Sequence, residues 1–111
     1  MNFFSLFKRS LIYNFKKKIS IDDDNININS LDKLFYHYGS DKAEIFKKTE
    51  NNGHGYSKFY KQKLEKFQNH KINILEIGSF AGASAAAFAK YLPKSNIFCF
   101  DVNISNFEYK S

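Results

Sequence analysis

Residues 72–101 constrain the fold of this chain most, because they read as a complete strand, helix and strand: INILEIGSFAGASAAAFAKYLPKSNIFCFD. Residues 72–77 are mostly large or β-branched apolar residues with little polar alternation, which is typical of a parallel strand covered on both faces. Residues 83–91 are rich in alanine and favour a helix that Pro93 must end. A second apolar run over residues 97–100 leads into Asp101. This order predicts a β-α-β unit with parallel strands.

A glycine-containing turn joins the first strand to the helix. Gly78 and Gly82 bracket the three residues between them, and glycine allows both a sharp turn and the close approach of a ligand to the backbone. Glu76 comes just before this turn. A carboxylate is costly to bury, so we expect Glu76 at the carboxyl end of the strand, in a crevice with solvent or ligand donors.

Asp101 follows the second strand, about twenty residues after the turn, where an acid can accept hydrogen bonds from both ribose hydroxyls. The spacing therefore indicates a nucleoside ligand. Phe80 fills the middle position of the G-x-G-x-x-G pattern that binds a pyrophosphate, so the sequence disfavours a nicotinamide-dependent enzyme. Tight binding of NADH would contradict this interpretation. In the alternative interpretation, Glu76 and Asp101 are only solvated strand ends.

Residues 75–84, LEIGSFAGAS, resemble the first motif of class I S-adenosylmethionine-dependent methyltransferases. Phe80 stands where the commonest form of that motif has a second glycine. The resemblance implies a Rossmann-like, doubly wound parallel sheet and S-adenosylmethionine as the cofactor. It also implies a cofactor site made from this motif and the end of the next strand: Glu76, Gly78, Ser79, Phe80, Gly82, Asp101 and Val102.

The resemblance gives these positions different roles. Glu76, Gly78 and Gly82 would line the methionine end of the cofactor. Ser79 and Phe80 would shape the loop above it. From the second strand, Asp101 would hold the ribose and Val102 would lie against the adenine.

The segment ahead of the motif is similar to that of bacterial O-methyltransferases of the macrocin and mycinamicin type, which modify sugars of macrolides. The similarity is carried by YGSDK at residues 38–42, by HGY at residues 54–56 and by FY at residues 59–60. It implies a saccharide or glycosylated small molecule as the acceptor, and it covers most of residues 31–102 together with the motif.

In that branch the upstream segment folds over the cofactor crevice, which makes Asp41, His54, Tyr56 and Tyr60 candidates for a lid. We assign His54 and Tyr56 to the cofactor site. These residues also have a purely structural interpretation. In it, Tyr60 is a core residue on an apolar helix face, His54 is a loop residue and Asp41 caps a turn. Two helices are expected in this segment, over residues 31–38 between Ser30 and a glycine, and from Ser57 to about residue 68.

Residues 1–20 place apolar side chains at helical spacing among five basic residues. We expect an amphipathic basic helix that contacts a membrane surface or a partner subunit, or that packs on its own domain. The charges interrupt and follow the apolar residues, unlike those of a signal peptide, and no run is long enough to cross a membrane.

Residues 21–30 form a polar linker, and residues 31–111 are expected to be the amino-terminal part of a methyltransferase domain. A complete doubly wound domain needs about 200 residues, whereas this chain has 111. We therefore expect a truncated chain whose catalytic base and any metal ligands lie beyond residue 111. Such a chain should be inactive and should bind the cofactor weakly or undetectably, and a micromolar affinity for S-adenosylmethionine in calorimetry would contradict this expectation. The alternative is a non-enzymatic fragment that acts as a binding or interaction module.

The net charge of +6 and pI near 9.4 do not require a polyanion, because scattered lysines with abundant asparagine and isoleucine are typical of an adenine- and thymine-rich coding sequence. No nucleic-acid partner is expected, because the lysines are not gathered with aromatic platforms. No metal site is expected either, since His37 and His70 lack ligand spacing. Cys99 is the single cysteine, which is compatible with a reducing, cytoplasmic compartment.

Overall fold

The computed structural model describes Phe3, Phe4, Phe7 and residues 18–110, and it contains the expected β-α-β unit. Strand β4 (Asn73–Ile77) leads through helix α4 (Ala83–Tyr91) to strand β5 (Asn96–Phe100). The two strands are parallel, and Glu76 lies opposite Cys99 in their register. The α/β class and the limits of the central helix are therefore confirmed.

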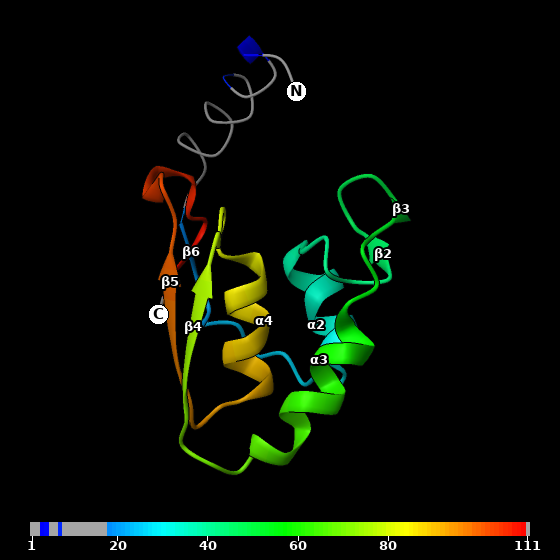
Figure 1. The fold of residues 1–111 in the computed structure, drawn as a ribbon, viewed down its shortest axis with the longest axis vertical. Coiled ribbons are helices and arrows are strands. Elements are labelled where there is room, and N and C mark those ends of the chain that lie inside the picture. The colour runs from blue at the N-terminus through cyan, green and yellow to red at the C-terminus, as the bar shows by residue number, and fades with distance from the viewer. Residues whose placement is uncertain (1–2, 5–6, 8–17, 111) are drawn as a thin grey trace.

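Two further helices cover one side of this unit (Figure 1). Helix α2 (Leu31–Tyr38) packs between α4 and helix α3 (Ser57–Leu64), which continues as the 3-10 helix η1 (Glu65–Phe67). The core lies where α2 meets α4, and the rings of Phe35 and Phe88 meet edge to face there, with centroids 5.4 Å apart. The apolar faces of the helices thus form the main core.

The ends of α2 agree with the sequence, whereas the start of α3 does not. The Ser30 side chain accepts a hydrogen bond from the Lys33 N–H, and Gly39 ends the helix at φ 74°. Ser57 does not cap α3, because its hydroxyl donates to Asp32 Oδ1 at 2.6 Å. The predicted Ser57 cap was wrong, since a tertiary partner takes up the side chain that local sequence assigned to the cap.

Two short strand pairs were not predicted. Strands β2 (Ile45–Phe46) and β3 (Asn51–Asn52) form an antiparallel hairpin. Strand β1 (Ile19–Ser20) pairs in parallel with β6 (Tyr109–Lys110), which follows the 3-10 helix η2 (Ile104–Asn106). Each described sheet has two strands, so the doubly wound arrangement stays a prediction.

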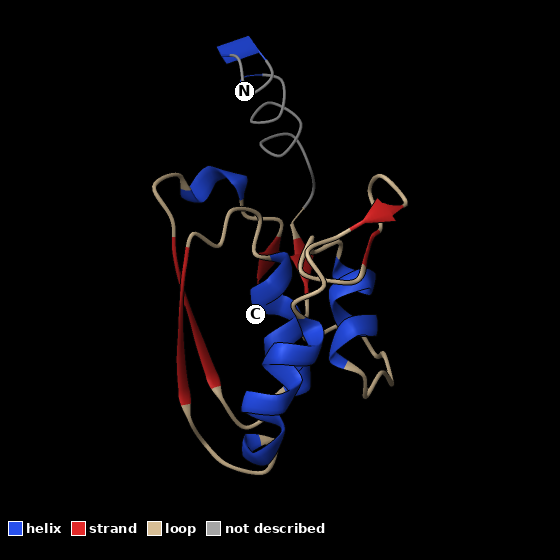
Figure 2. Cartoon of the chain, turned by 45° about the vertical axis from the view of Figure 1, so that its right-hand side comes forward, coloured by secondary structure: helices blue, strands red, loops and turns tan. Residues whose placement is uncertain are grey.

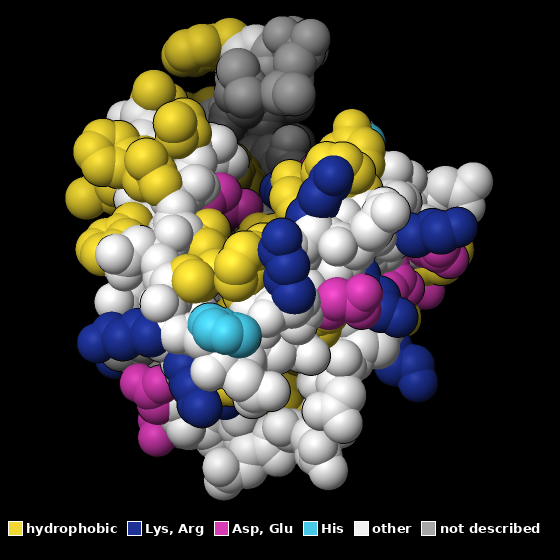
Figure 3. Space-filling model, turned by 60° about the horizontal axis from the view of Figure 1, so that its bottom comes forward, with side chains coloured by type: hydrophobic (Ala, Val, Ile, Leu, Met, Phe, Trp, Pro, Cys, Tyr) yellow, Lys and Arg dark blue, Asp and Glu magenta, His cyan; other side chains and the backbone are white. Residues whose placement is uncertain are grey.

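Among the described residues, the sheet of β4 and β5 is covered on one face only, contrary to the expectation of cover on both faces. Figure 2 shows the helices on one side of these two strands. Figure 3 shows hydrophobic side chains gathered on the side of the molecule that the two strands form. We call the uncovered side the outer face. Its large apolar residues are more than half exposed: Leu75 59%, Ile77 82%, Phe98 53% and Phe100 66%. The apolar sequence of these strands did not predict this exposure. Every second residue points to a face on which no described residue packs.

Residues 21–30 were expected to be a solvated linker, but part of this segment packs on the core. Ile26 and Ile28 lie against the core, and Ile21 is buried. Asp24 Oδ2 lies 3.0 Å from His37 Nε2 and accepts a hydrogen bond from the Tyr38 hydroxyl at 3.0 Å. The expected helix over residues 1–20 falls mostly outside the described residues. Within the described part of the chain, no helix has the length and hydrophobicity that a membrane crossing requires.

Candidate functional site

The loop after β4 folds back toward the end of β5. The Gly78 N–H donates to the Phe100 carbonyl at 2.7 Å, and the Gly82 N–H donates to the Ser79 carbonyl at 2.8 Å. Gly78 and Gly82 both have φ 80°, and Phe80 has φ 49°. Two of these three left-handed positions carry glycine, the residue that takes this conformation without strain. The glycine turn therefore forms where the sequence placed it.

Asp101 joins this loop to the end of β5. Its Oδ2 accepts a hydrogen bond from the Phe80 N–H at 2.7 Å, and its Oδ1 accepts one from the Asn103 N–H at 3.0 Å. These backbone donors, Asn103 first and then Phe80, lower the pKa of the Asp101 carboxyl. Asp101 thus remains an anion at the carboxyl edge of the sheet, close to the turn that follows Glu76.

Glu76 reaches this edge, but its side chain points to the covered face of the sheet. It accepts a hydrogen bond from the Ser84 hydroxyl, and its Oε1 lies 3.7 Å from Lys42 Nζ. The side chains of Glu76 and Lys42 are 11% and 22% exposed. We expected solvent or ligand donors around Glu76, but its carboxylate instead pairs with Lys42 in the interior, because a buried carboxylate needs a compensating charge.

One oxygen of this carboxylate lacks a partner. Glu76 Oε2 is buried and accepts no hydrogen bond from any described residue. Lys42 Nζ also donates to Ser84 Oγ at 3.3 Å, and the contacts that Lys42 and Ser84 make with this carboxylate are both to Oε1. Lys42 and Ser84 were not among the predicted site residues. No spacing rule relates Lys42 to Glu76, since Lys42 lies in a turn after α2, far from β4 in the sequence.

The segment that carries Lys42 also brings three of the four predicted lid residues together, namely Asp41, His54 and Tyr56. The N–H groups of His54 and Tyr56 donate to the carbonyls of Asp41 at 2.6 Å and Lys42 at 2.9 Å. His54 Nε2 lies 3.4 Å from Asp41 Oδ2, and its ring stacks on Tyr56 with centroids 5.3 Å apart. The β2–β3 hairpin beside them lies at the same end of the molecule as the carboxyl ends of β4 and β5 (Figure 1).

The remaining predicted site residues have different surroundings. Ser79 is buried and donates to the Glu76 carbonyl at 3.2 Å, so it supports the loop from within. Gly82 lies under the Phe107 ring, and a Cβ there would be 3.0 Å from the ring carbon Cδ1. Val102 is fully exposed. Tyr60 is a core residue that meets Phe88 edge to face at 5.2 Å, which is the alternative the sequence left open for it.

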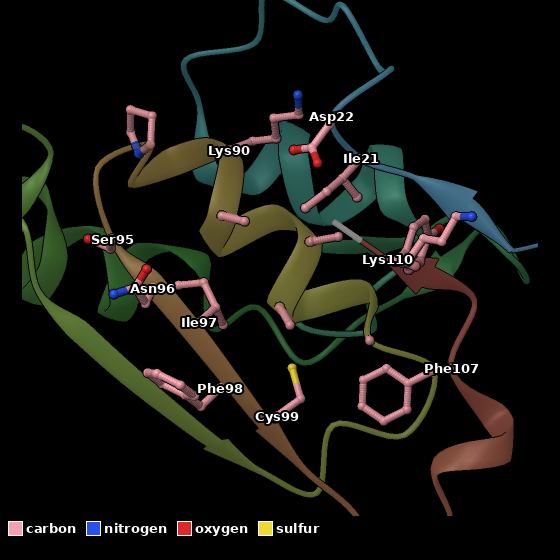
Figure 4. Close-up of a pocket in the computed structure, with 16 residues that line it drawn as sticks. Ile21, Asp22, Lys90, Ser95, Asn96, Ile97, Phe98, Cys99, Phe107 and Lys110 are labelled. Carbon is pink, nitrogen blue, oxygen red and sulfur yellow. The ribbon is translucent and has the colours of Figure 1, made fainter.

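A cavity of about 590 Å³ lies apart from Glu76 and Asp101, between α4, the free edge of β5 and the β1–β6 pair (Figure 4). Alanines of α4 and Ile97 form its apolar wall, and the Cys99 thiol faces it. Burial raises the pKa of that thiol, so Cys99 behaves as a small apolar residue. The cavity touches the loop only at Gly82, which leaves it outside the candidate site. Among the described residues, no group of three or more potential metal ligands comes together.

Comparison with models of known protein families, with curated proteins and with solved structures finds no match to this chain.

Proposed function

We propose that this chain is the cofactor-binding part of an S-adenosylmethionine-dependent methyltransferase that modifies a hydroxyl of a saccharide or glycosylated small molecule. The observation that carries the proposal is the hydrogen bond from the Phe80 N–H to Asp101 Oδ2, which joins the glycine loop to the acid of the next strand. Methyl transfer to a hydroxyl requires a positioned donor and acceptor and the removal of one proton. We assign cofactor binding to this loop and leave the catalytic base unassigned.

Three features of the loop fit such a ligand. Each carboxylate oxygen of Asp101 accepts one hydrogen bond from a backbone N–H. A carboxylate can accept about four hydrogen bonds in total, so acceptor positions remain for ribose hydroxyls. A Cβ on Gly78 would meet nothing within 4 Å, so a ligand can approach its backbone. Glu76 Oε2 is a buried acceptor without a partner among the described residues. It could accept a hydrogen bond from the ammonium group of the cofactor when the packing around it opens to admit the ligand.

Ligand-observed NMR tests the proposal, since it detects binding that is too weak for calorimetry. We expect saturation transfer from the protein to the adenine and ribose protons of S-adenosylmethionine, with a Kd on the order of 1 mM. Gly78→Ala should abolish the signal, because its methyl group would occupy the open approach. Gly39→Ala is the matched control: Gly39 also has positive φ, and its added Cβ would make only an ordinary contact at 3.6 Å with Lys48. No transfer to the wild type, or equal loss in both variants, would refute the proposal.

A non-enzymatic interaction module is the second candidate, because the outer face of β4 and β5 is apolar and no described residue covers it. Parallel sheets normally have both faces covered, so another protein that packs on Leu75 and Phe98 would complete this one. Sedimentation velocity of the wild type and of Leu75→Ser distinguishes the two functions. Self-association that the variant removes, together with no ligand signal in NMR, would favour the interaction module.

A further inference from the structure

The edge of β5 that faces away from β4 carries backbone groups that no described residue binds. The Asn96 N–H donates to the Ile72 carbonyl at 3.0 Å, so the backbone of Asn96 faces β4. In a parallel pair, every second residue of a strand bonds to the same neighbouring strand. The N–H and C=O groups of Ile97 and Cys99 therefore point away from β4, and within the described chain they have no hydrogen-bond partner.

The cavity beside α4 runs along this edge (Figure 4). Residues 95–99 line it on one side, and Tyr109 and Lys110 of β6 line it on the other. Its inner wall includes Ala85 and Ala89 of α4, whose small side chains leave the space open. We call this cavity the β5 slot. It places unpaired backbone groups next to an apolar wall.

The β5 slot has room for one strand. A residue in a packed sheet takes up about 3.3 Å along the strand, about 4.8 Å between strands and about 10 Å between layers, or roughly 160 Å³. The cavity volume of about 590 Å³ therefore corresponds to roughly four residues of extended chain. Because the β1–β6 pair lies on the far side, the slot admits a single extended segment and excludes the sheet edge of a second folded copy.

Charge distinguishes among the segments that fit. The chain has a net charge of +6, so a second copy is repelled and an acidic segment is attracted. Two lysines, Lys90 and Lys110, are among the described residues that line the slot, against one acid, Asp22. The inner wall between these charges is apolar. The matching segment therefore has apolar residues in its middle and acidic residues at its ends.

We propose that the β5 slot binds an extended, acid-flanked segment of another protein by strand addition. The segment bonds to the backbone of Ile97 and Cys99 and packs alternate apolar side chains on Ala85 and Ala89. In this mode of recognition, main-chain hydrogen bonds supply affinity and alternate side chains supply specificity. A two-stranded sheet also gains stability from a third strand. The inference is independent of the cofactor site, which shares only Gly82 with the slot lining.

Amide exchange of the full chain with a model peptide tests the proposal. The probe is a labelled nine-residue peptide with Asp-Glu at each end and Val-Thr-Val-Thr-Val between. We expect a Kd on the order of 0.1 mM in fluorescence anisotropy. At ten times that concentration, exchange of the Ile97 and Cys99 amides should slow about tenfold, while Phe98, whose N–H already faces β4, should not change. No binding, or equal slowing at all three amides, would overturn the proposal.

Two matched peptides separate the backbone and charge contributions. N-methylation of the five central residues removes their N–H donors and keeps their side chains, and it should weaken binding at least tenfold. Lysines in place of the four acids should weaken binding about tenfold at about 0.05 M salt, and less at about 0.5 M. Equal binding of all three peptides would contradict the addition of an acid-flanked strand.

Variants of the slot then locate the contact. Ala85→Leu with Ala89→Leu narrows the slot, keeps good helix formers in α4 and should weaken binding at least tenfold. Gln62→Leu adds a leucine at an exposed position of α3 and should leave binding unchanged. Bound peptide should also slow alkylation of Cys99, the single cysteine, about tenfold, because its thiol faces the slot (Figure 4). Unchanged alkylation would place the peptide elsewhere and overturn the proposal.

Two further measurements distinguish the slot from other protein contacts. Leu75→Ser should leave peptide binding unchanged, because Leu75 lies on the outer face of the sheet. Loss of binding in this variant would move the contact to the outer face and contradict the proposal. Sedimentation velocity tests a second copy as the occupant. Self-association that Ala85→Leu with Ala89→Leu removes, and that protects the Ile97 amide without peptide, would assign the slot to a second copy and would also overturn the proposal.

Discussion

The Phe80 N–H donates a 2.7 Å hydrogen bond to Asp101 Oδ2, and this contact connects the glycine loop with the acid that follows β5. Phe80 holds φ 49°, a conformation that costs a residue with a side chain about 1–2 kcal/mol. A charge-assisted hydrogen bond is strong enough to offset that cost. The carboxylate of Asp101 therefore stabilises the loop itself, besides any role toward a ligand.

Asp101→Asn should loosen this loop. The Phe80 and Asn103 N–H groups bind different oxygens of Asp101, and asparagine has an NH2 donor in place of one of them, so it cannot accept from both in this geometry. We expect about 1 kcal/mol of lost stability and roughly tenfold faster hydrogen exchange at the Phe80 amide. Asn103→Ala is the control, because it removes the neighbouring side chain and keeps both backbone donors. Unchanged Phe80 exchange in Asp101→Asn would show that the contact contributes nothing.

Replacing Lys42 alone should lower the free energy of unfolding more than replacing Lys42 and Glu76 together. Lys42→Met leaves a buried carboxylate without its cation, and we expect a loss of about 3 kcal/mol in the free energy of unfolding. The double variant with Glu76→Met removes both charges and should recover most of this loss. Urea denaturation of the two single variants and the double variant measures the coupling. Additive losses would mean that the two side chains do not interact.

Phe35→Ala should leave the protein close to unfolded. Phe35 is fully buried and meets both Phe88 and Tyr60 edge to face, so its removal should cost about 3–5 kcal/mol. A domain of this size has a total stability of the same order. Thermal denaturation followed by circular dichroism should show the loss, whereas Phe59→Ala, at an exposed position, should change stability little. Similar melting of both variants would contradict the assigned core.

Asp24 should make folding sensitive to acid. Burial of its carboxyl opposes ionisation, but hydrogen bonds from His37 and Tyr38 outweigh burial and lower the folded pKa. Its stabilising contribution is therefore present above the unfolded pKa, about 4, and is lost as the pH falls through the folded value. Asp24→Asn should show a smaller loss of stability than the wild type between about pH 4 and pH 2. Identical acid profiles would exclude this role.

The local elements could be predicted because their causes are local. Alanine content and Pro93 define α4, and a serine cap and a final glycine define α2. The surroundings of the candidate site could not be predicted in the same way. The sequence placed Glu76 at the strand end but did not reveal Lys42 beside it, since that neighbour belongs to a turn more than thirty residues earlier. It also gave no sign that Phe107 would cover Gly82.

The sequence alone determined the order of β4, α4 and β5, the position of the glycine turn and the two acids at neighbouring strand ends, because backbone propensities and parallel pairing act over short stretches. The tertiary structure decided how those acids are used. Packing of α2 against α4 placed the segments that carry Lys42 and Ser84, which surround Glu76, and the folding of the loop after β4 onto the end of β5 let Asp101 accept a hydrogen bond from the Phe80 N–H. Such contacts join residues that are distant in the chain, and their energies depend on burial, which no local pattern specifies.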